Sequence, residues 1–217
     1  MKQFYYFKHL LFSLCLLAFG LSVQAQTTYD WQTSAPDGNW KQGAASGPRW
    51  NPGGLWDEPP SGSGTRLRFD NNTFPTMTNN VTAGYIIGQL FFGSSATSAR
   101  SIGGNSVQFF EFGGTWPRIE NQSTTLHTIN FPFAASTNSG FNMELVASSG
   151  SMDFGASATI NNNGRTVQIY GNNTATDGTN RAIRLVGVVS GSGILNVSQF
   201  GVVKLNATHT YTGQTQI

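Results

Sequence analysis

The chain has 217 residues, of which 12 are lysine or arginine, 10 are aspartate or glutamate, 26 are glycine and one is cysteine. Charged residues make up only 10% of the chain and form no basic cluster, which argues against a nucleic acid or an anionic lipid surface as partner. The single cysteine allows neither an internal disulfide nor a cysteine-ligated metal site. The abundance of turn-forming and β-branched residues predicts a chain that is almost entirely β-structure.

Residues 1–25 have the pattern of an export signal. Lys2 and Lys8 give a positive start, and residues 10–21 form an apolar run that is too short to cross a bilayer. Small residues before Gln26 predict cleavage there, which removes both lysines and the only cysteine and leaves ten basic and ten acidic residues. We therefore expect a secreted or cell-surface protein. The alternative is an uncleaved membrane anchor.

Residues 26–78 are rich in tryptophan and proline. They hold four of the five tryptophans and six of the eight prolines, and only Thr65–Asp70 alternates clearly enough to predict a strand. We expect this segment to cap the first coil of a solenoid, because an open sheet edge promotes aggregation. The alternative is a platform of exposed indole rings that stack on sugars. The tryptophans concerned are Trp31, Trp40, Trp50 and Trp56.

Residues 79–217 alternate between short apolar strands and polar turn clusters. The turns are tracts such as Ser148–Ser151 and Gly191–Gly193, and Asn163-Gly164 is the only strong hairpin dipeptide. Such spacing fits either an antiparallel β-sandwich or a solenoid with two or three strands per coil. The expected strands are 85–92, 106–112, 127–133, 143–147, 166–170, 182–189, 194–197, 202–205 and 211–217.

The solenoid is the better fit to this region. Its turns are polar tracts, and Val107-Gln-Phe-Phe is similar to Val167-Gln-Ile-Tyr, which indicates degenerate internal repeats. We therefore predict an all-β, right-handed parallel β-helix of roughly six coils with about 20–25 residues each. The antiparallel sandwich is kept as the alternative. Alternate residues of the closing strands should point inward, namely Ile183, Leu185, Leu195, Val203 and Leu205.

Candidates for chemistry are few. We expect His127 to be packed or half-exposed and His209 to face solvent, and two such isolated histidines make neither a zinc site nor a hydrolytic triad. Glu111, Glu120 and Glu144 would approach one another if the coils stack in register, which would be the place for a catalytic acid pair. We predict no catalytic residue, no metal and no cofactor. A polysaccharide-active enzyme and a carbohydrate-binding module are the alternatives.

The closing segment, 187–217, carries glycines at regular positions and ends in Asn206-Ala-Thr-His-Thr-Tyr-Thr-Gly. In this it resembles the autotransporter-associated β-strand repeat, a module of secreted bacterial surface proteins. It departs from the repeat at Val197–Gly201, where the family has a Lys-x-Gly-x-Gly centre, and at Gly213–Thr215, where it has Gly-Gly-Thr. The residues that fit the repeat are Gly191, Gly193, Leu195, Gly201, Leu205, Asn206, Tyr211, Thr212, Gly213 and Thr215.

This resemblance implies a structural, non-enzymatic passenger protein that serves as a rigid stalk or an adhesin. Glycans and host or neighbouring cell surfaces would be its partners. The resemblance also implies that further repeats and a C-terminal transporter barrel or sorting segment follow residue 217, so we expect this chain to be part of a longer protein. Contact with a membrane would then occur only through that missing C-terminal region.

Overall fold

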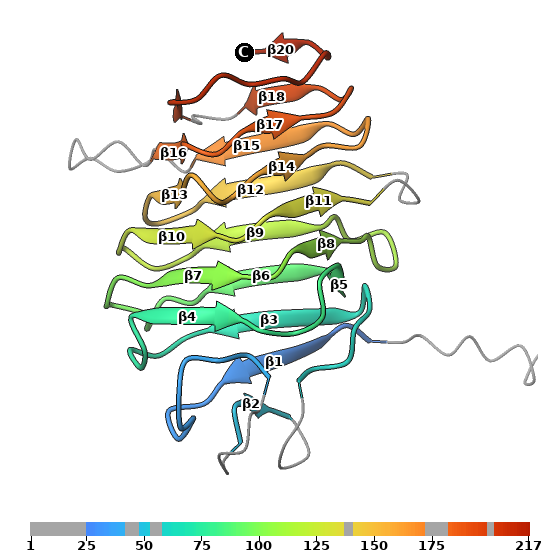
Figure 1. Ribbon diagram of the computed structural model, residues 1–217. Coiled ribbons are helices and arrows are strands. Elements are labelled where there is room, and N and C mark those ends of the chain that lie inside the picture. The colour runs from blue at the N-terminus through green and yellow to red at the C-terminus, as the bar shows by residue number, and fades with distance from the viewer. Residues whose placement is uncertain (1–24, 42–47, 53–57, 137–140, 172–181, 199–201) are drawn as a thin grey trace, which may run out of the picture.

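The structure is a computed structural model that describes residues 25–41, 48–52, 58–136, 141–171, 182–198 and 202–217. In these residues twenty strands and no helix are found, and the strands wind into a β-solenoid of about five turns (Figure 1). The prediction of an all-β parallel solenoid is therefore confirmed. The antiparallel sandwich is excluded, because neighbouring strands of successive turns run parallel. The predicted export signal lies almost wholly outside the described residues.

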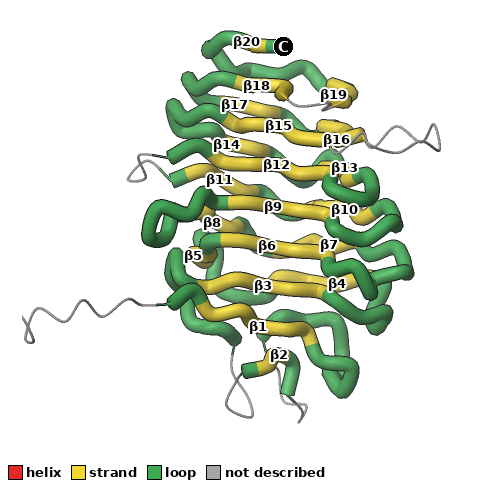
Figure 2. The backbone as a smooth tube through the Cα atoms, turned by 180° about the vertical axis from the view of Figure 1, so that it is seen from behind, coloured by secondary structure: helices red, strands yellow, loops and turns green. Residues whose placement is uncertain are grey.

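Sheet A follows the solenoid over its described length, and Figure 2 shows its strands stacked one above the other. In spatial order its nine described strands are β2 (Trp50–Asn51), β1 (Thr27–Trp31), β3 (Thr65–Phe69), β6 (Gln89–Phe92), β9 (Arg118–Asn121), β12 (Met143–Ala147), β15 (Val167–Gly171), β18 (Leu195–Ser198) and β20 (Thr215–Gln216).

Sheets B and C complete each turn. The six described strands of sheet B are β19 (Val202–Leu205), β16 (Ala182–Leu185), β13 (Met152–Phe154), β10 (His127–Asn130), β7 (Ser101–Gly104) and β4 (Thr76–Asn79). The five described strands of sheet C are β17 (Val189–Ser190), β14 (Ile160–Asn161), β11 (Phe133–Ala135), β8 (Val107–Phe109) and β5 (Tyr85–Ile87). One strand from each sheet makes one rung of the solenoid.

The length of a turn varies more than the sequence predicted. Arg66 pairs with Gln89, which is 23 residues further on, and Gln89 pairs with Arg118, which is 29 residues further on. Leu195 and Thr215, at the C-terminal end, are paired across only 20 residues. The core requires only that each strand return in register, so the corners absorb the extra residues. This is why about five turns are found where roughly six were predicted.

The parallel ladder begins before residue 79, inside the segment predicted as a cap. Strand β1 pairs parallel with β3, and Asn39 forms an isolated parallel bridge with Thr78 of sheet B. The predicted strand in Thr65–Asp70 is β3. Strand β2 then pairs antiparallel with β1 and covers the outer edge of sheet A. The N-terminal segment is thus both an incomplete rung and a lid over it.

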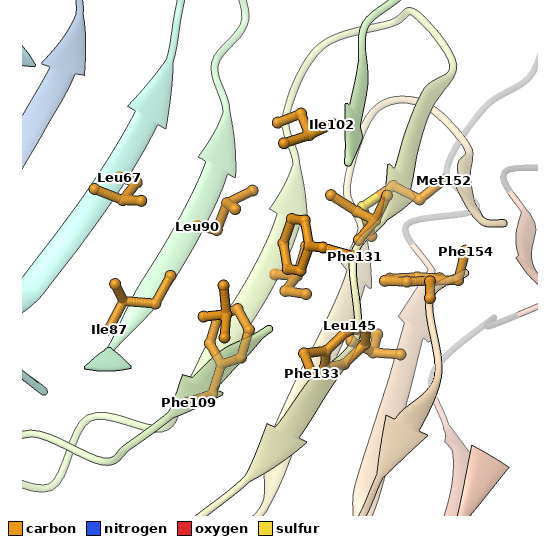
Figure 3. Close-up of a cluster of buried hydrophobic side chains, with 14 of the residues drawn as sticks. Leu67, Ile87, Leu90, Ile102, Phe109, Phe131, Phe133, Leu145, Met152 and Phe154 are labelled. Carbon is orange, nitrogen blue, oxygen red and sulfur yellow. The ribbon is translucent and has the colours of Figure 1, made fainter. Parts of the chain in front are cut away.

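The interior is filled by side chains that repeat in register from rung to rung (Figure 3). Within sheet A, Leu67, Leu90, Ile119 and Leu145 follow one another, and all four are fully buried. The ring of Phe133 packs 5.5 Å from that of Phe154 on the next rung. Burial of such side chains stabilises the fold by about 1.5–3 kcal/mol each, so stacking supplies the stability that the chain cannot take from disulfides.

His127 is fully buried in this interior, which decides between the packed and half-exposed placements that the sequence left open. Its ring stacks on Phe92 at 4.1 Å, and its Nε2 lies 2.7 Å from the hydroxyl oxygen of Ser123. Burial, with a smaller contribution from nearby Arg100, lowers the pKa of His127 to about 4. Arg100 is itself 2% exposed and donates to the carbonyl oxygens of Asn71 and Thr73. The histidine is therefore neutral in the folded chain at pH 7.

The buried histidine should make stability depend on pH. In the unfolded chain the pKa of His127 returns to about 6.5. Between that pH and about 4 the unfolded state therefore binds a proton at His127 that the folded state does not bind. The free energy of unfolding then has its full value above pH 6.5 and decreases by about 2–3 kcal/mol as the pH falls towards 4. Urea unfolding of the wild type and of His127→Leu between pH 7 and 4.5 checks this. If the difference in free energy of unfolding between the two proteins stays constant over this pH range, the prediction is wrong.

Candidate functional site on the outer face of sheet A

The tryptophans predicted to offer a sugar-binding platform are buried. Trp31, Trp40 and Trp50 are 2%, 1% and 2% exposed. Trp31 and Trp50 meet edge to face at 5.0 Å, and the indole N–H of Trp50 donates to the carbonyl oxygen of Trp40. Phe69 of the first complete rung packs beneath them. The platform prediction is wrong for these three residues, because their faces cover the core, and Trp56 lies outside the described residues.

A partly buried ion pair supports this lid. Arg49 precedes Trp50 and is 4% exposed, and its guanidinium donates to both carboxylate oxygens of Asp37 at 2.9 and 3.0 Å. Burial acts to raise the pKa of Asp37, but the backbone N–H of Asn39 and the guanidinium of Arg49 outweigh it, so the pKa is lowered. The pair ties the loop before β2 to the turn that carries Trp40.

The described glycines of the predicted repeat motif lie at crowded corners that lead into sheet A. A Cβ on Gly193 would lie 1.9 Å from the carbonyl oxygen of Arg165 on the preceding turn, and one on Gly213 would lie 1.9 Å from that of Gly193. Gly191 has a φ of 101°, a conformation that other residues rarely adopt. The close approach of stacked corners and the positive φ of Gly191 explain why these positions are glycine. Gly201 lies outside the described residues.

Gly193→Ala should therefore destabilise the chain. The methyl group meets backbone that cannot move without disturbing the rung below, so we expect a loss of about 1–3 kcal/mol, the usual cost of overpacking. Gly62→Ala is the matched control, because a Cβ there meets nothing within 4 Å. Thermal unfolding of both variants measures the contrast. Equal midpoints would show that the corner relaxes freely.

The remaining motif residues build the last rungs. Leu195 is 1% exposed, as predicted, and the amide of Asn206 donates to the carbonyl oxygen of Leu185. Tyr211 packs against the core, and its hydroxyl bonds to that of Thr215. The expected burial of Leu205 is not observed. This residue pairs with Leu185 in the inward register but is 47% exposed, because no described rung covers it.

The prediction that His209 faces solvent also needs correction, because its side chain is partly buried and hydrogen-bonded. Its Nδ1 accepts the backbone N–H of Val189 at 3.0 Å, which requires a neutral ring with the proton on Nε2. Partial burial lowers the pKa of His209. The side chain therefore joins the last described corner to strand β17.

The outer face of sheet A brings together two of the three predicted acids. Arg118 donates from Nε to Glu144 at 2.6 Å and from Nη1 to Glu120 at 3.0 Å. Both carboxylates are buried, at 7% exposure each. Burial disfavours the charge on Arg118, but its two carboxylate partners outweigh that effect and raise its pKa. The prediction that Glu120 and Glu144 would meet is confirmed, and the guanidinium that joins them was not predicted.

Glu111 does not join this cluster. Its carboxylate accepts the backbone N–H of Gly114 within the loop that follows β8. The cluster is extended by other groups instead. The Ser148 hydroxyl donates to Glu120 at 2.6 Å, and Tyr170, two rungs along from Glu120 in the same outward row, has its pKa raised by burial and by the charge of Glu144.

Two outward rows run along sheet A beside this cluster. One row holds Arg66, Gln89 and Arg118, and the other holds Arg68 and Phe91, before reaching Glu120. The guanidinium of Arg68 pairs with Asp30 on β1. That of Arg66 lies over the ring of Phe91, 4.7 Å from its centroid. The face thus offers cations, acids and an aromatic ring in fixed positions.

The described residues contain no group of three or more histidine, cysteine, aspartate or glutamate side chains that could hold a metal ion. Within those same ranges, no helix is long and apolar enough to cross a membrane. Comparisons of the chain with models of protein families, with curated proteins and with solved structures found no match.

Proposed function

We propose that this chain is a non-enzymatic, secreted or cell-surface β-solenoid that acts as a rigid stalk or an adhesive surface. The observation that carries the proposal is the uninterrupted stacking of rungs, in which each turn hides its apolar side chains under the next. Such an object is elongated and presents long regular faces to its surroundings. The resemblance of residues 187–217 to the autotransporter-associated β-strand repeat agrees with this role, as does the export pattern of residues 1–25.

The arrangement of the acids also supports a non-enzymatic role. A catalytic acid pair needs one carboxyl group free to give a proton and another free to attack or to activate water. Here a single guanidinium binds both Glu120 and Glu144, and Ser148 occupies a second oxygen of Glu120. Carboxylates that are held in this way stabilise the face of the sheet.

Export is tested by producing the full chain in a Gram-negative bacterium. The expected product is found outside the cytoplasm and begins at Gln26, as read by N-terminal sequencing. Substitution of Leu14 and Leu16 by arginine in the apolar run should abolish processing, and Lys41→Gln, far from the signal, should not. Recovery of an unprocessed chain in the cytoplasm would contradict the proposal.

A polysaccharide-active enzyme is the second candidate, and the meeting of Glu120 and Glu144 on one face is the observation that favours it. The test is incubation of the purified chain with neutral and acidic polysaccharides, followed by assay for new reducing ends and unsaturated products. The stalk proposal expects none. Release of products that Glu120→Gln abolishes would establish the enzyme instead.

A further inference from the structure

Gln26 occupies an unusual position for a side-chain amide. It directly precedes the first described strand, β1, and it becomes the first residue of the chain if the predicted export signal is cleaved after Ala25. Its Nε2 is buried, and among the described residues this nitrogen has no hydrogen-bond partner. A buried amide without a partner costs about 1–3 kcal/mol, so the fold does not stabilise this amide where it lies.

The backbone around Gln26 is held firmly on its C-terminal side. The N–H of Thr27 donates to the carbonyl oxygen of Gly64 at 2.9 Å, and Thr27 pairs with Thr65 in the parallel ladder. Ala25, on the other side, is exposed and belongs to no strand. Cleavage after Ala25 therefore leaves the new amino group at the surface, at the end of a strand that is fixed in place.

The side chain of Gln26 has room to move. Its Nε2 lies over Gly88, only 2.7 Å from the position that a Cβ would take there, so the amide fits this corner because residue 88 is glycine. The two neighbours of Gln26, Ala25 and Thr27, line a hollow of about 550 Å³. The amide nitrogen can therefore turn towards the backbone nitrogen of its own residue without giving up a hydrogen bond to any described residue.

We propose that Gln26 is a modification site, which closes to an N-terminal pyroglutamate once the export signal is removed. The neutral α-amino group attacks Cδ of the side-chain amide, so a bond forms between the α-nitrogen and Cδ while the bond between Cδ and Nε2 breaks. Nε2 leaves as ammonia with the proton that the α-nitrogen gives up, and no further reactant is consumed. The inference rests on the exported role proposed above, because only cleavage before Gln26 creates this amino group.

The cyclised residue suits this corner better than the unmodified one. An α-amino group has a pKa of about 8, so a useful fraction of it is neutral and reactive between pH 7 and 8. Ring closure removes both the unpartnered amide nitrogen and the charge of the terminus, and it leaves a compact neutral lactam before β1. Aminopeptidases need a free α-amino group, so the lactam also protects β1, which pairs with both β2 and β3.

The test is mass spectrometry of the exported chain after purification and incubation at pH 8. We expect the mass of residues 26–217 less one ammonia, about 17 Da, and an N-terminal peptide that amine-labelling reagents do not label. Gln26→Asn is the matched control, because it keeps an amide and the cleavage site but cannot close a five-membered ring. It should keep its full mass and a free amino group. An aminopeptidase should remove its first residue and leave the wild-type terminus intact.

A synthetic peptide of residues 26–31 shows how fast the same sequence cyclises without the fold. The folded chain should cyclise at least as fast, whether in the cell or during the incubation, because no described residue holds the amide nitrogen of Gln26. Fragment masses identify the first residue, since a lactam blocks Edman degradation. A chain that begins at Gln26 and keeps its amino group while the peptide cyclises overturns the inference and leaves export intact. A chain that begins at another residue overturns both the inference and the predicted cleavage site.

Discussion

Replacing Trp40 by alanine should lower the free energy of unfolding by about 3–5 kcal/mol, as for other large-to-small changes of a buried aromatic side chain. Its ring lies 5.8 Å from both Phe69 and Phe131 and 6.0 Å from Trp50, and only 1% of the residue is exposed. Neighbouring rungs are fixed by their ladders and cannot collapse into the space left behind. The loss should therefore approach the upper part of the range.

Urea unfolding measures this loss, and hydrogen exchange locates it. The amide of Thr78 donates to Gly38 beside Trp40, so its exchange should accelerate more than that of amides in β15. Trp116→Ala is the matched control, because Trp116 is half-buried and its ring lies 6.5 Å from that of Phe141, in a looser contact than those of Trp40. It should cost about 1 kcal/mol. Similar losses in the two variants would show that the N-terminal lid does not hold the first rung closed.

The tryptophans show what composition can and cannot decide. Four indoles within about thirty residues predict an aromatic cluster, but a lid and a sugar platform require the same residues. What separates them is whether the faces meet one another or solvent. That depends on the antiparallel return of β2, which brings Trp50 against Trp31, and two short strands with many residues between them leave no periodic signal in the sequence.

Strand positions were predicted well where apolar alternation is strong, as in β12 and β19, whose predicted bounds are those observed. The corners between strands were harder to predict. The run 85–92 reads as one strand, yet it bends at Gly88 into β5 and β6. This corner requires glycine, because a Cβ there would lie 2.2 Å from the carbonyl oxygen of Ser63. An apolar run does not reveal that its two halves face different sheets.

The Asn163-Gly164 turn illustrates the same limit. Both residues have positive φ, as the dipeptide predicts for a tight turn. The turn nevertheless joins β14 of sheet C to β15 of sheet A, which belong to successive turns of the solenoid, and the two do not pair with each other. Local chemistry determined the backbone conformation, and stacking on the neighbouring rungs determined what it connects.

Several strands were missed because their residues are not typical of strands. Strand β9 reads Arg-Ile-Glu-Asn, β14 reads Ile-Asn and β7 reads Ser-Ile-Gly-Gly. In a solenoid a strand needs only one or two inward apolar residues, because both of its edges are paired. The same reasoning explains the site. Glu120 and Glu144 were predicted to meet on the assumption of stacking, but Arg118 could be placed between them only once its pairing with Glu144 was known.

Replacing Arg118 by methionine should lower the free energy of unfolding by about 3 kcal/mol at pH 7. Removing one partner of a buried ion pair costs about 3–5 kcal/mol, and the lower end applies because 35% of the Arg118 side chain is exposed. The change leaves Glu120 and Glu144, with side chains 9% and 10% exposed, without the guanidinium that binds both of them. Each carboxylate then takes up a proton more readily, so the deficit relative to the wild type should shrink between pH 7 and pH 5.

A triple variant separates charge from packing. Adding Glu120→Gln and Glu144→Gln to Arg118→Met removes the buried charges while keeping side chains of similar size, so most of the lost stability should return. Urea unfolding of the three proteins at pH 7 and pH 5 gives the comparison. If the triple variant is as unstable as Arg118→Met and its deficit does not depend on pH, the loss comes from the aliphatic stem of Arg118. The outer face of sheet A would then be held together by packing, and its acids would be free to take part in other chemistry.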